Sequence, residues 1–561
     1  EIDAFEQSVL QSAAAGSAFK ISDPWLDHSV GWAQSILQTN IHYLDGQMRP
    51  MPCPAEYNFY FSHDAFVTDL AAVYFDPQRV KNDLEFTAEH ANADSVIPHA
   101  YYWRDGQYVT EFADYDNWNN YWFIIVSGKY LRHTADSAFV QTIYPFLEKS
   151  LETGLKTIRD GLIWSNRPDW WDIGRNFGPR SYMTILAIKA LREFVYISSV
   201  LKMNSGHLPV YESLADRMQR NLIEKLWDED QQYLINYFAD GSKDEHYYIG
   251  SLLAVHYGLL DTGKMSAMIE TANSALLDRD VGIYNVYPMD FKQLIDYLNF
   301  AGNEAGEPNY YLNGGVWSQG NAWYALAQIE AGQHKAAFDF IRKTMTVKGI
   351  TSGPNGQPAM YEVRNPDAAR PDVYSMVDKP QFLWAAGWYL YSLYHLFGIA
   401  ENTWNIAFQP FLLEDQKEVQ FTIYVHGSPA SVLIRGQGDY IRRIEYDGRS
   451  YPSAVISAEL SDIKNIQIIL GAPDIPYVKE TESPLVVADF NSSQNKLFIR
   501  LNAFPGHRSN VDLICPTSPK RALISGRDAS DELVVDLKKS IYHVSLRFVH
   551  VNEIEEIEIN F

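Results

Sequence analysis

Two patterns of hydrophobic and polar positions divide the chain. Up to about residue 404, apolar residues recur every three or four positions over long segments, which is the spacing of a helix with one buried face. Pro145 falls inside the first clear segment, so we expect that helix to be broken in two or to begin later. The clearest segments are 136–160, 182–202, 210–227, 249–260, 320–331 and 381–398.

Beyond residue 404, short runs alternate between apolar and polar residues, with frequent turn residues between them. The tryptophans follow the same division, because the last of them is Trp404. Period-two alternation with regular breaks is typical of an antiparallel sandwich. The sequence therefore predicts a mainly α fold with a helical domain over 1–404 and an antiparallel β-sandwich over 405–561. The alternating runs are 419–425, 430–434, 465–470, 496–501 and 541–548.

The predicted helices recur roughly every 30 residues and often pair as hairpins, without a tight internal repeat. This favours a closed toroid over a solenoid. About a dozen helices in two concentric rings, an (α/α)6 toroid, would place the inner helix ends and their loops around a central cleft. Those loops are rich in Trp, Tyr, Asp and Asn.

Charge and composition exclude several classes of partner. With 46 Lys and Arg against 70 Asp and Glu, the net charge is −24, which argues against nucleic acid and against an anionic membrane surface. Cys53 and Cys515 are the only cysteines, so neither a disulfide framework nor a Cys-rich metal site is expected. The 14% aromatic content suits sugar ligands, although a large helical core uses aromatics too.

The segment 382–400 is uncharged and long enough to span a bilayer. It contains Tyr389, Tyr391, Tyr394 and His395, whose polar groups need partners, so we expect a buried helix and not a membrane span. The first residues lack the basic start and apolar run of a signal peptide, although a leader could have been removed. We expect a soluble protein, and the compartment, cytoplasmic or periplasmic, stays open.

The sequence lacks the usual phosphate-loop, serine-nucleophile and zinc-protease motifs. The run 244–246, Asp-Glu-His, is too compact for a metal site and is expected to be a solvated loop. Carboxylates among aromatics remain, and Asp169-Trp170-Trp171-Asp172 is the sharpest case. Indole faces desolvate a neighbouring acid and raise its pKa toward that of a general acid, but both aspartates could instead cap turns.

The run 169–174 resembles the Asp-Trp-Asn-Asp-Gly motif of cellobiose and chitobiose phosphorylases, whose second aspartate is the general acid, and a Trp-Met-Asp segment of bacterial amylo-1,6-glucosidases. Further similarities follow in the same order at 313–323, 360–363 and 380–399. The ordered set implies membership of the six-hairpin (α/α)6-toroid glycosidases and phosphorylases. It also implies that Asp172 is the general acid and that Glu362 occupies the base position. A salt bridge of Glu362 with Arg364 or Arg370 is the alternative.

Two departures from these families matter. Where the phosphorylases carry a hydroxyl-rich stretch that helps bind phosphate, this chain has Trp384-Ala385-Ala386-Gly387, which favours water as the nucleophile. The relatives also have a large N-terminal β-domain that this sequence does not match, so we expect a fragment or a shorter architecture.

The remaining candidate residues would hold sugar hydroxyls or cover the apolar face of a ring. Asp64 belongs to the run 57–64, which resembles an Arg-Asp segment of the debranching relatives, with His63 in place of the Arg. An N-cap cluster is the alternative for residues 114–117, and an ion pair is the alternative for Arg175 and Arg180. The candidate substrate-binding residues are Asp64, Trp103, Arg104, Asp114, Asp116, Asn117, Asp169, Trp170, Trp171, Arg175, Trp317, Gln319 and Trp384.

Trp118, Trp122, His99 and His256 are expected to be core residues. Taken together, the sequence predicts an inverting, exo-acting glycoside hydrolase that acts on an oligosaccharide or glycoside without a cofactor or metal. A disaccharide phosphorylase of the same fold and a non-catalytic glycan-binding protein are the alternatives. The sugar, its linkage and the oligomeric state stay open.

Overall fold

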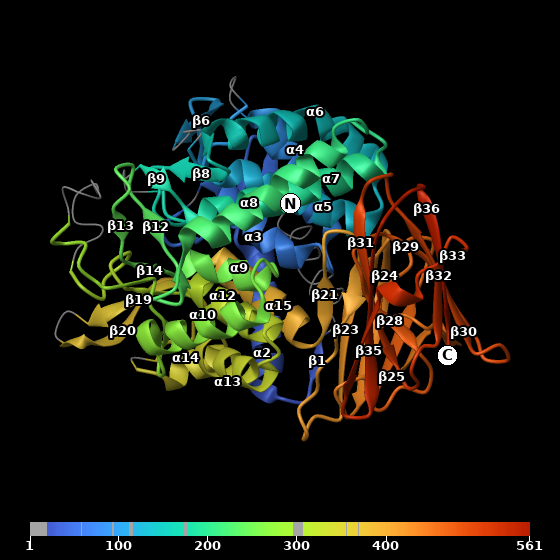
Figure 1. Ribbon diagram of the computed structural model, residues 1–561. Coiled ribbons are helices and arrows are strands. Elements are labelled where there is room, and N and C mark those ends of the chain that lie inside the picture. Colours follow the sequence, from blue (N-terminus) through green and yellow to red (C-terminus); the bar gives the residue numbers. More distant parts are fainter. Residues whose placement is uncertain are drawn as a thin grey trace.

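The computed structural model describes residues 19–57, 59–91, 95–111, 116–172, 177–294, 307–354, 356–367 and 370–561 (Figure 1). Helices, blue to yellow in Figure 1, occupy the part of the chain before about residue 400. Strands, orange to red, form most of the rest and lie beside the helices. The predicted order of helices followed by strands is therefore confirmed.

One set of helices packs in a closed order, in which each helix contacts the next and the last returns to the first. Nearly every residue of these helices is buried, because they have neighbours on all sides. Their N-terminal ends lie together at one end of the set, where the candidate site is found. In this order they are α3 (Ser62–Ala72), α5 (Asn119–Thr134), α7 (Ser181–Val200), α9 (Leu253–His256), α12 (Ser318–Glu330) and α15 (Leu383–Leu396).

A second set of helices packs on the outside of the first and buries only one stripe each, as the 3.6-residue spacing predicts. Four of the described outer helices begin after an aspartate whose side chain caps the first turn: Asp23, Asp76, Asp136 and Asp261. The outer helices are α2 (Pro24–Thr39), α4 (Pro77–His90), α6 (Ser137–Gly154), α8 (Leu208–Leu226), α10 (Thr262–Ala275) and α13 (His334–Thr344).

The expected break at Pro145 was wrong, because α6 is continuous from Ser137 to Gly154. A proline inside a helix leaves the carbonyl four residues earlier without its donor. Here that carbonyl belongs to Gln141, which is exposed together with Pro145 on the solvent side of the helix, so water can satisfy it.

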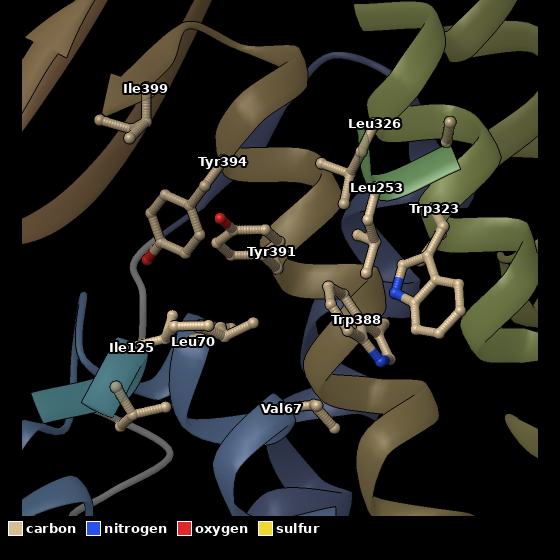
Figure 2. Packing of buried hydrophobic residues seen from close by; sticks show 14 of the residues in the cluster. Val67, Leu70, Ile125, Leu253, Trp323, Leu326, Trp388, Tyr391, Tyr394 and Ile399 are labelled. Atoms are coloured by element: carbon tan, nitrogen blue, oxygen red, sulfur yellow. The ribbon is translucent and has the colours of Figure 1, made fainter. Parts of the chain in front are cut away.

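Side chains from the inner helices fill the centre of the helical region (Figure 2). Trp388 of α15 meets Trp323 of α12 with ring centroids 6.1 Å apart, and Leu70 and Ile125 approach from α3 and α5. The segment predicted to be a buried helix is α15, which lies inside this core. Among the described residues, no helix is both long enough and apolar enough to cross a membrane.

The strand-rich region begins with a six-stranded sheet in the order β1-β23-β24-β27-β25-β26. Its apolar face continues the helical core, since Phe421 packs on Phe19 and Tyr394 with centroids 5.2 and 5.5 Å away. The strands are β1 (Lys20–Ile21), β23 (Glu418–Val425), β24 (Ser428–Gly436), β25 (Ile441–Tyr446), β26 (Arg449–Ser450) and β27 (Asn465–Leu470).

The expectation of a purely antiparallel arrangement was wrong in this sheet, because β24 and β27 pair in parallel. Parallel neighbours need a long crossover, and the segment that carries β25 and β26 supplies it. The start of the described chain also joins the sheet, where Lys20 of β1 pairs with Gln420 of β23.

Two further sheets are antiparallel and share a separate hydrophobic core that includes Leu497, Leu513, Leu546 and Ile559. One has the order β28 (Tyr477–Thr481), β31 (Arg508–Cys515), β35 (Ile541–Val549), β34 (Leu533–Lys538). The other has the order β29 (Leu485–Asn491), β30 (Lys496–Asn502), β36 (Ile554–Asn560), β32 (Arg521–Ile524), β33 (Arg527–Asp528).

Candidate active site

A cavity of about 80 Å³ opens at the N-terminal ends of the inner helices. Aromatic side chains form most of its wall, and three carboxylic acids, Asp64, Asp172 and Glu362, face into it. The full lining is Pro52, Tyr57, Phe61, His63, Asp64, His99, Trp118, Trp170, Trp171, Asp172, Tyr311, Leu312, Trp317, Glu362, Phe382 and Trp384.

Asp172 lies at the end of a loop that follows β8 (Leu162–Ser165) and is fixed by two tryptophans. Trp170 Nε1 donates a hydrogen bond to Asn285 Oδ1 at 2.9 Å. Trp171 packs against Tyr248 and Phe291, with centroids 5.8 and 5.3 Å away. Burial raises the pKa of Asp172 above its ordinary value, although Arg167 opposes the shift. The loop thus presents an acid that holds its proton more tightly than a solvated aspartate does.

Glu362 lies near the start of β19 (Tyr361–Asp367), which pairs with β20 (Arg370–Pro380) and with β18 (Val316–Trp317). It is 6% exposed, and burial raises its pKa to about 7 even though Lys379 opposes the shift. Lys379 Nζ lies 2.7 Å from Glu362 Oε2. Of the two expected alternative partners, the Arg370 side chain lies outside the described part of the structure, and Arg364 donates a hydrogen bond to the carbonyl of Pro354. The ion pair of Glu362 described above is with Lys379, which the sequence did not single out.

The two acids share one cavity although they are far apart in the sequence. The charge of Asp172 contributes to the raised pKa of Glu362. Asp64, in the first turn of α3, has a pKa well above its usual range because of burial first and the charges of Glu362 and Asp172 next. The three carboxyls therefore repel one another when ionised, and ionising all three at once would cost free energy.

Three of the predicted tryptophans come together from different elements. Trp170 lies on the Asp172 loop, Trp317 ends β18, and Trp384 is in the first turn of α15. Their centroids are 4.7 Å apart for Trp170 and Trp317, 5.9 Å for Trp170 and Trp384, and 6.2 Å for Trp317 and Trp384. They provide a broad apolar wall beside the acids.

Two other predicted residues lie behind this wall and outside the cavity lining. Asp169 is fully buried, and its Oδ2 accepts a hydrogen bond from the Gly250 amide at 3.0 Å. Gln319 Oε1 lies 3.0 Å from His63 Nε2 and accepts from Trp388 Nε1 at 3.3 Å. The contact of Gln319 supports His63, which lines the cavity.

Four predicted residues that the structure describes, Trp103, Arg104, Asp116 and Asn117, are not part of the cavity lining. Trp103 and Arg104 lie on β5 (Ala100–Arg104), where Trp103 is 38% exposed and packs on Tyr108. Asp116 Oδ2 accepts two hydrogen bonds from Asn166, at 2.8 and 2.7 Å.

Asn117 Oδ1 accepts a hydrogen bond from the Asn119 amide at 2.8 Å, which closes a turn before α5, whereas the N-cap residue of α5 is Trp118. Asp114 and Arg175 fall outside the described residues.

The sequence matches the family model "Glycosyl hydrolase 94 superfamily, catalytic domain" over residues 68–348. The chain belongs to the glycosyl hydrolase 94 superfamily. This match confirms the expected relation to the six-hairpin glycosidases. No curated protein sequence matches the chain.

Solved structures resemble this superfamily member at low sequence identity. A GH63 mannosylglycerate hydrolase from Thermus thermophilus aligns with a TM-score of 0.50 and 14% identity, over 65% of this chain and 99% of that one. A GH78 rhamnosidase of Bacillus sp. GL1 aligns with a TM-score of 0.50 and 15% identity, over 75% of this chain and 42% of that one. A sialidase aligns with a TM-score of 0.58 and 12% identity, over 77% of this chain and 40% of that one. At these identities the likeness concerns the fold, which is related to glycoside hydrolases.

Sequence reasoning missed several lining residues of this superfamily member. Tyr311 lines the cavity and belongs to no motif. Lys379, which pairs with Glu362 from outside the lining, has no motif either, and only the pairing of β19 with β20 brings it to Glu362. His99 and Trp118 were predicted to be core residues; Trp118 is buried and His99 is half-buried, and both also line the cavity. Burial lowers the pKa of His99 to about 3, with Arg167 acting in the same direction, so this imidazole is neutral at ordinary pH.

The run 244–246 is not a solvated loop, since Asp244 and His246 are 1% and 4% exposed. His246 Nδ1 lies 2.6 Å from Asp244 Oδ1 and its Nε2 lies 2.8 Å from Asp290 Oδ1. Arg180 joins the cluster, 3.7 Å from Asp244, which is the ion-pair alternative expected for it. Within the described ranges, no three His, Cys, Asp or Glu side chains are placed to hold a metal ion.

Proposed function

We propose that this protein is an inverting, exo-acting glycoside hydrolase in which Asp172 is the general acid and Glu362 is the general base. One observation carries the proposal: the two acids line the same small cavity, and burial raises the pKa of both. Glycosidic cleavage needs such a pair, with one carboxyl protonated and the other ionised.

Each acid has a defined step. Asp172 gives its proton to the glycosidic oxygen as the bond to the anomeric carbon breaks. Glu362 takes a proton from a water molecule whose oxygen attacks that carbon from the opposite face, so the configuration inverts. After the reaction Asp172 is ionised and Glu362 is protonated, and exchange with solvent restores both. Lys379 lies beside Glu362 and favours its ionised form, which supports assigning the base role to Glu362.

The size of the cavity supports exo action. At about 10–15 Å³ for each enclosed water, 80 Å³ holds about five to eight waters, which is close to the space of one sugar ring. The tryptophan wall of Trp170, Trp317 and Trp384 would cover the apolar face of that ring, and Asp64 would accept hydrogen bonds from its hydroxyls.

Water is favoured over phosphate as the nucleophile. In this mechanism Glu362 is ionised, and its negative charge in the cavity opposes the binding of a phosphate ion. Ala385 and Ala386 stand where a phosphorylase would carry hydroxyls. The superfamily relation keeps a disaccharide phosphorylase as the alternative, and a glycan-binding protein without turnover is the second.

For the architecture we propose an (α/α)6 toroid over 1–404 followed by a β-sandwich domain over 405–561. The closed order of the inner helices supports the first part, and the two sheets around a separate core support the second. Strand β1 crosses this division, because it belongs to the start of the chain and pairs with β23.

The test is a panel of α- and β-linked oligosaccharides and aryl glycosides, with and without inorganic phosphate, while NMR follows the anomer of the product. Hydrolysis predicts phosphate-independent release of a terminal sugar with inverted configuration. Release of a sugar 1-phosphate would establish the phosphorylase, and binding without turnover of any substrate would establish the glycan-binding protein.

Two variants separate the roles. Asp172→Asn should lower kcat about 100- to 10,000-fold on substrates with poor leaving groups, and much less on activated aryl glycosides that need no protonation. Glu362→Gln should lower kcat both on substrates with poor leaving groups and on activated aryl glycosides. The exposed Glu245→Gln is the matched control, and circular dichroism checks the fold. Parental activity in either active-site variant would refute its assigned role.

A further inference from the structure

A buried lysine is paired with the proposed base. Lys379 is 8% exposed, with Nζ 2.7 Å from Glu362 Oε2 and 3.9 Å from Asp378 Oδ2. The ammonium also lies 5.1 Å from the ring of Tyr57 and 5.5 Å from the ring of Tyr311, and both rings line the cavity. Among the described residues, no other cation forms an ion pair with Glu362.

The backbone holds the lysine in an unusual conformation. Lys379 has φ +46° and Gln381 has φ +61°, a region that residues other than glycine seldom adopt. Several long-range contacts fix this turn. Gln381 Oε1 accepts from Trp32 Nε1 and its carbonyl accepts from Asn40 Nδ2, both at 2.7 Å. Strain of this kind persists where the surroundings enforce it, and it is concentrated at functional sites.

The pairing of the strands explains why the two side chains meet. Tyr361 pairs with Pro380 and Val363 pairs with Asp378, so Glu362 and Lys379 are the residues between these partners on opposite strands. Cross-strand neighbours of this kind lie close enough for opposite charges to interact.

We propose that Lys379 is a positioning residue of the reaction proposed above: its ammonium keeps Glu362 ionised and holds Oε2, which leaves Oε1 to take the proton from the attacking water. The proposal rests on the proposed function for the role of Glu362, but the charge coupling can be measured without turnover.

The charges around Glu362 explain why a cation is needed there. Asp64 from α3, Asp172 from its loop and Asp378 from β20 all oppose a negative charge on Glu362. Lys379 is the counter-charge, and with it in place the pKa of Glu362 is about 7. An opposite charge at this range lowers the pKa of a carboxyl by about 1–3 units, so removing it should raise the pKa of Glu362 by that much.

The experiment compares pH profiles of kcat/KM for the parent, Lys379→Met and Lys379→Arg on activated aryl glycosides, which need no proton from Asp172, so that the profile reports Glu362. In the parent, activity should rise with pH through about 7, because the base must be ionised. In Lys379→Met this rise should move up by about 1–3 pH units, so that activity at pH 7 falls about 5- to 500-fold and recovers at higher pH. Lys379→Arg should keep the parental midpoint. The exposed Lys335→Met, which removes a surface ion pair with Asp339, is the matched control.

A second measurement separates this proposal from the proposed function. Difference infrared titration of the Glu362 carboxyl, identified by its loss in Glu362→Gln, reports its protonation without any substrate. A midpoint that rises in Lys379→Met supports the coupling even if the enzyme proves not to be a hydrolase. An unchanged midpoint, or an activity loss that is equal at every pH, would overturn the proposal. Lys379→Gln gives the same comparison should Lys379→Met fail to fold.

Discussion

Replacement of His246 by Gln tests whether a buried ionic cluster supports the loop of the proposed acid. His246 precedes β14 (Tyr247–Tyr248) and joins Asp244 to Asp290 through its two ring nitrogens. Phe291, next to Asp290, packs against both His246 and Trp171, with centroids 5.1 and 5.3 Å away. The cluster therefore lies directly under the tryptophan that precedes Asp172.

The structure sets the size of the expected effect. Burial alone would lower the pKa of His246, but its hydrogen bonds to Asp244 and Asp290 outweigh burial and raise the pKa from 6.5 to about 9. A folded-state pKa above the unfolded value stabilises the fold fully below pH 6.5, and this contribution is lost as pH rises through 9. A shift of 2.5 units (9 − 6.5) corresponds to about 3 kcal/mol at about 1.4 kcal/mol for each unit.

The assay is equilibrium urea unfolding of the parent and of His246→Gln from pH 6 to pH 10, followed by circular dichroism. At pH 6 the variant should be less stable by about 3 kcal/mol, since Asp244 and Asp290 lose their interaction with the protonated histidine, while Arg180 remains beside Asp244. The difference should shrink by about 3 kcal/mol toward pH 10, where the parental histidine is neutral as well. The difference between the unfolding free energies of the two proteins at each pH removes the contributions of groups that titrate alike in both.

A constant difference between the two proteins over the whole range would refute the reasoning. It would mean that His246 stays neutral in the folded state, and that its loss affects packing and not charge. His246→Gln should also lower kcat with little change in KM, because the Trp171 contact that holds Asp172 is loosened.

Two further changes test the packing and the cavity. In Gly387→Ala, the added Cβ would lie 2.7 Å from Thr68 Cα, so α15 and α3 must separate. We expect the free energy of unfolding, measured in urea, to fall by about 1–3 kcal/mol. Gly31→Ala, whose added Cβ meets open space, is the control and should not destabilise the protein. Asp64→Asn should lower kcat/KM about 3- to 10-fold, the value of a hydrogen bond between neutral groups, without lowering the melting temperature. Unchanged kcat/KM would exclude Asp64 from substrate binding.

The sequence alone predicted the elements whose signal is local. The 3.6-residue spacing predicted α7 and α8, and the alternation of apolar and polar residues predicted β23 and β30, because one buried face imposes these periods on a helix or a strand. The buried helix α15 followed from the Tyr and His residues in an uncharged run. A short motif also singled out Trp170, Trp171 and Asp172, which line the cavity.

Only the tertiary structure decided which residues meet. Lys379 has no motif, and its meeting with Glu362 depends on the register of a hairpin. The same aspartate-and-aromatic composition describes Asp116, which bonds Asn166, and Asp64, which faces the cavity. Composition and spacing report how a segment buries its own face, whereas a site forms from side chains of distant segments. Their distances are set by how helices and strands pack, and no local pattern records that packing.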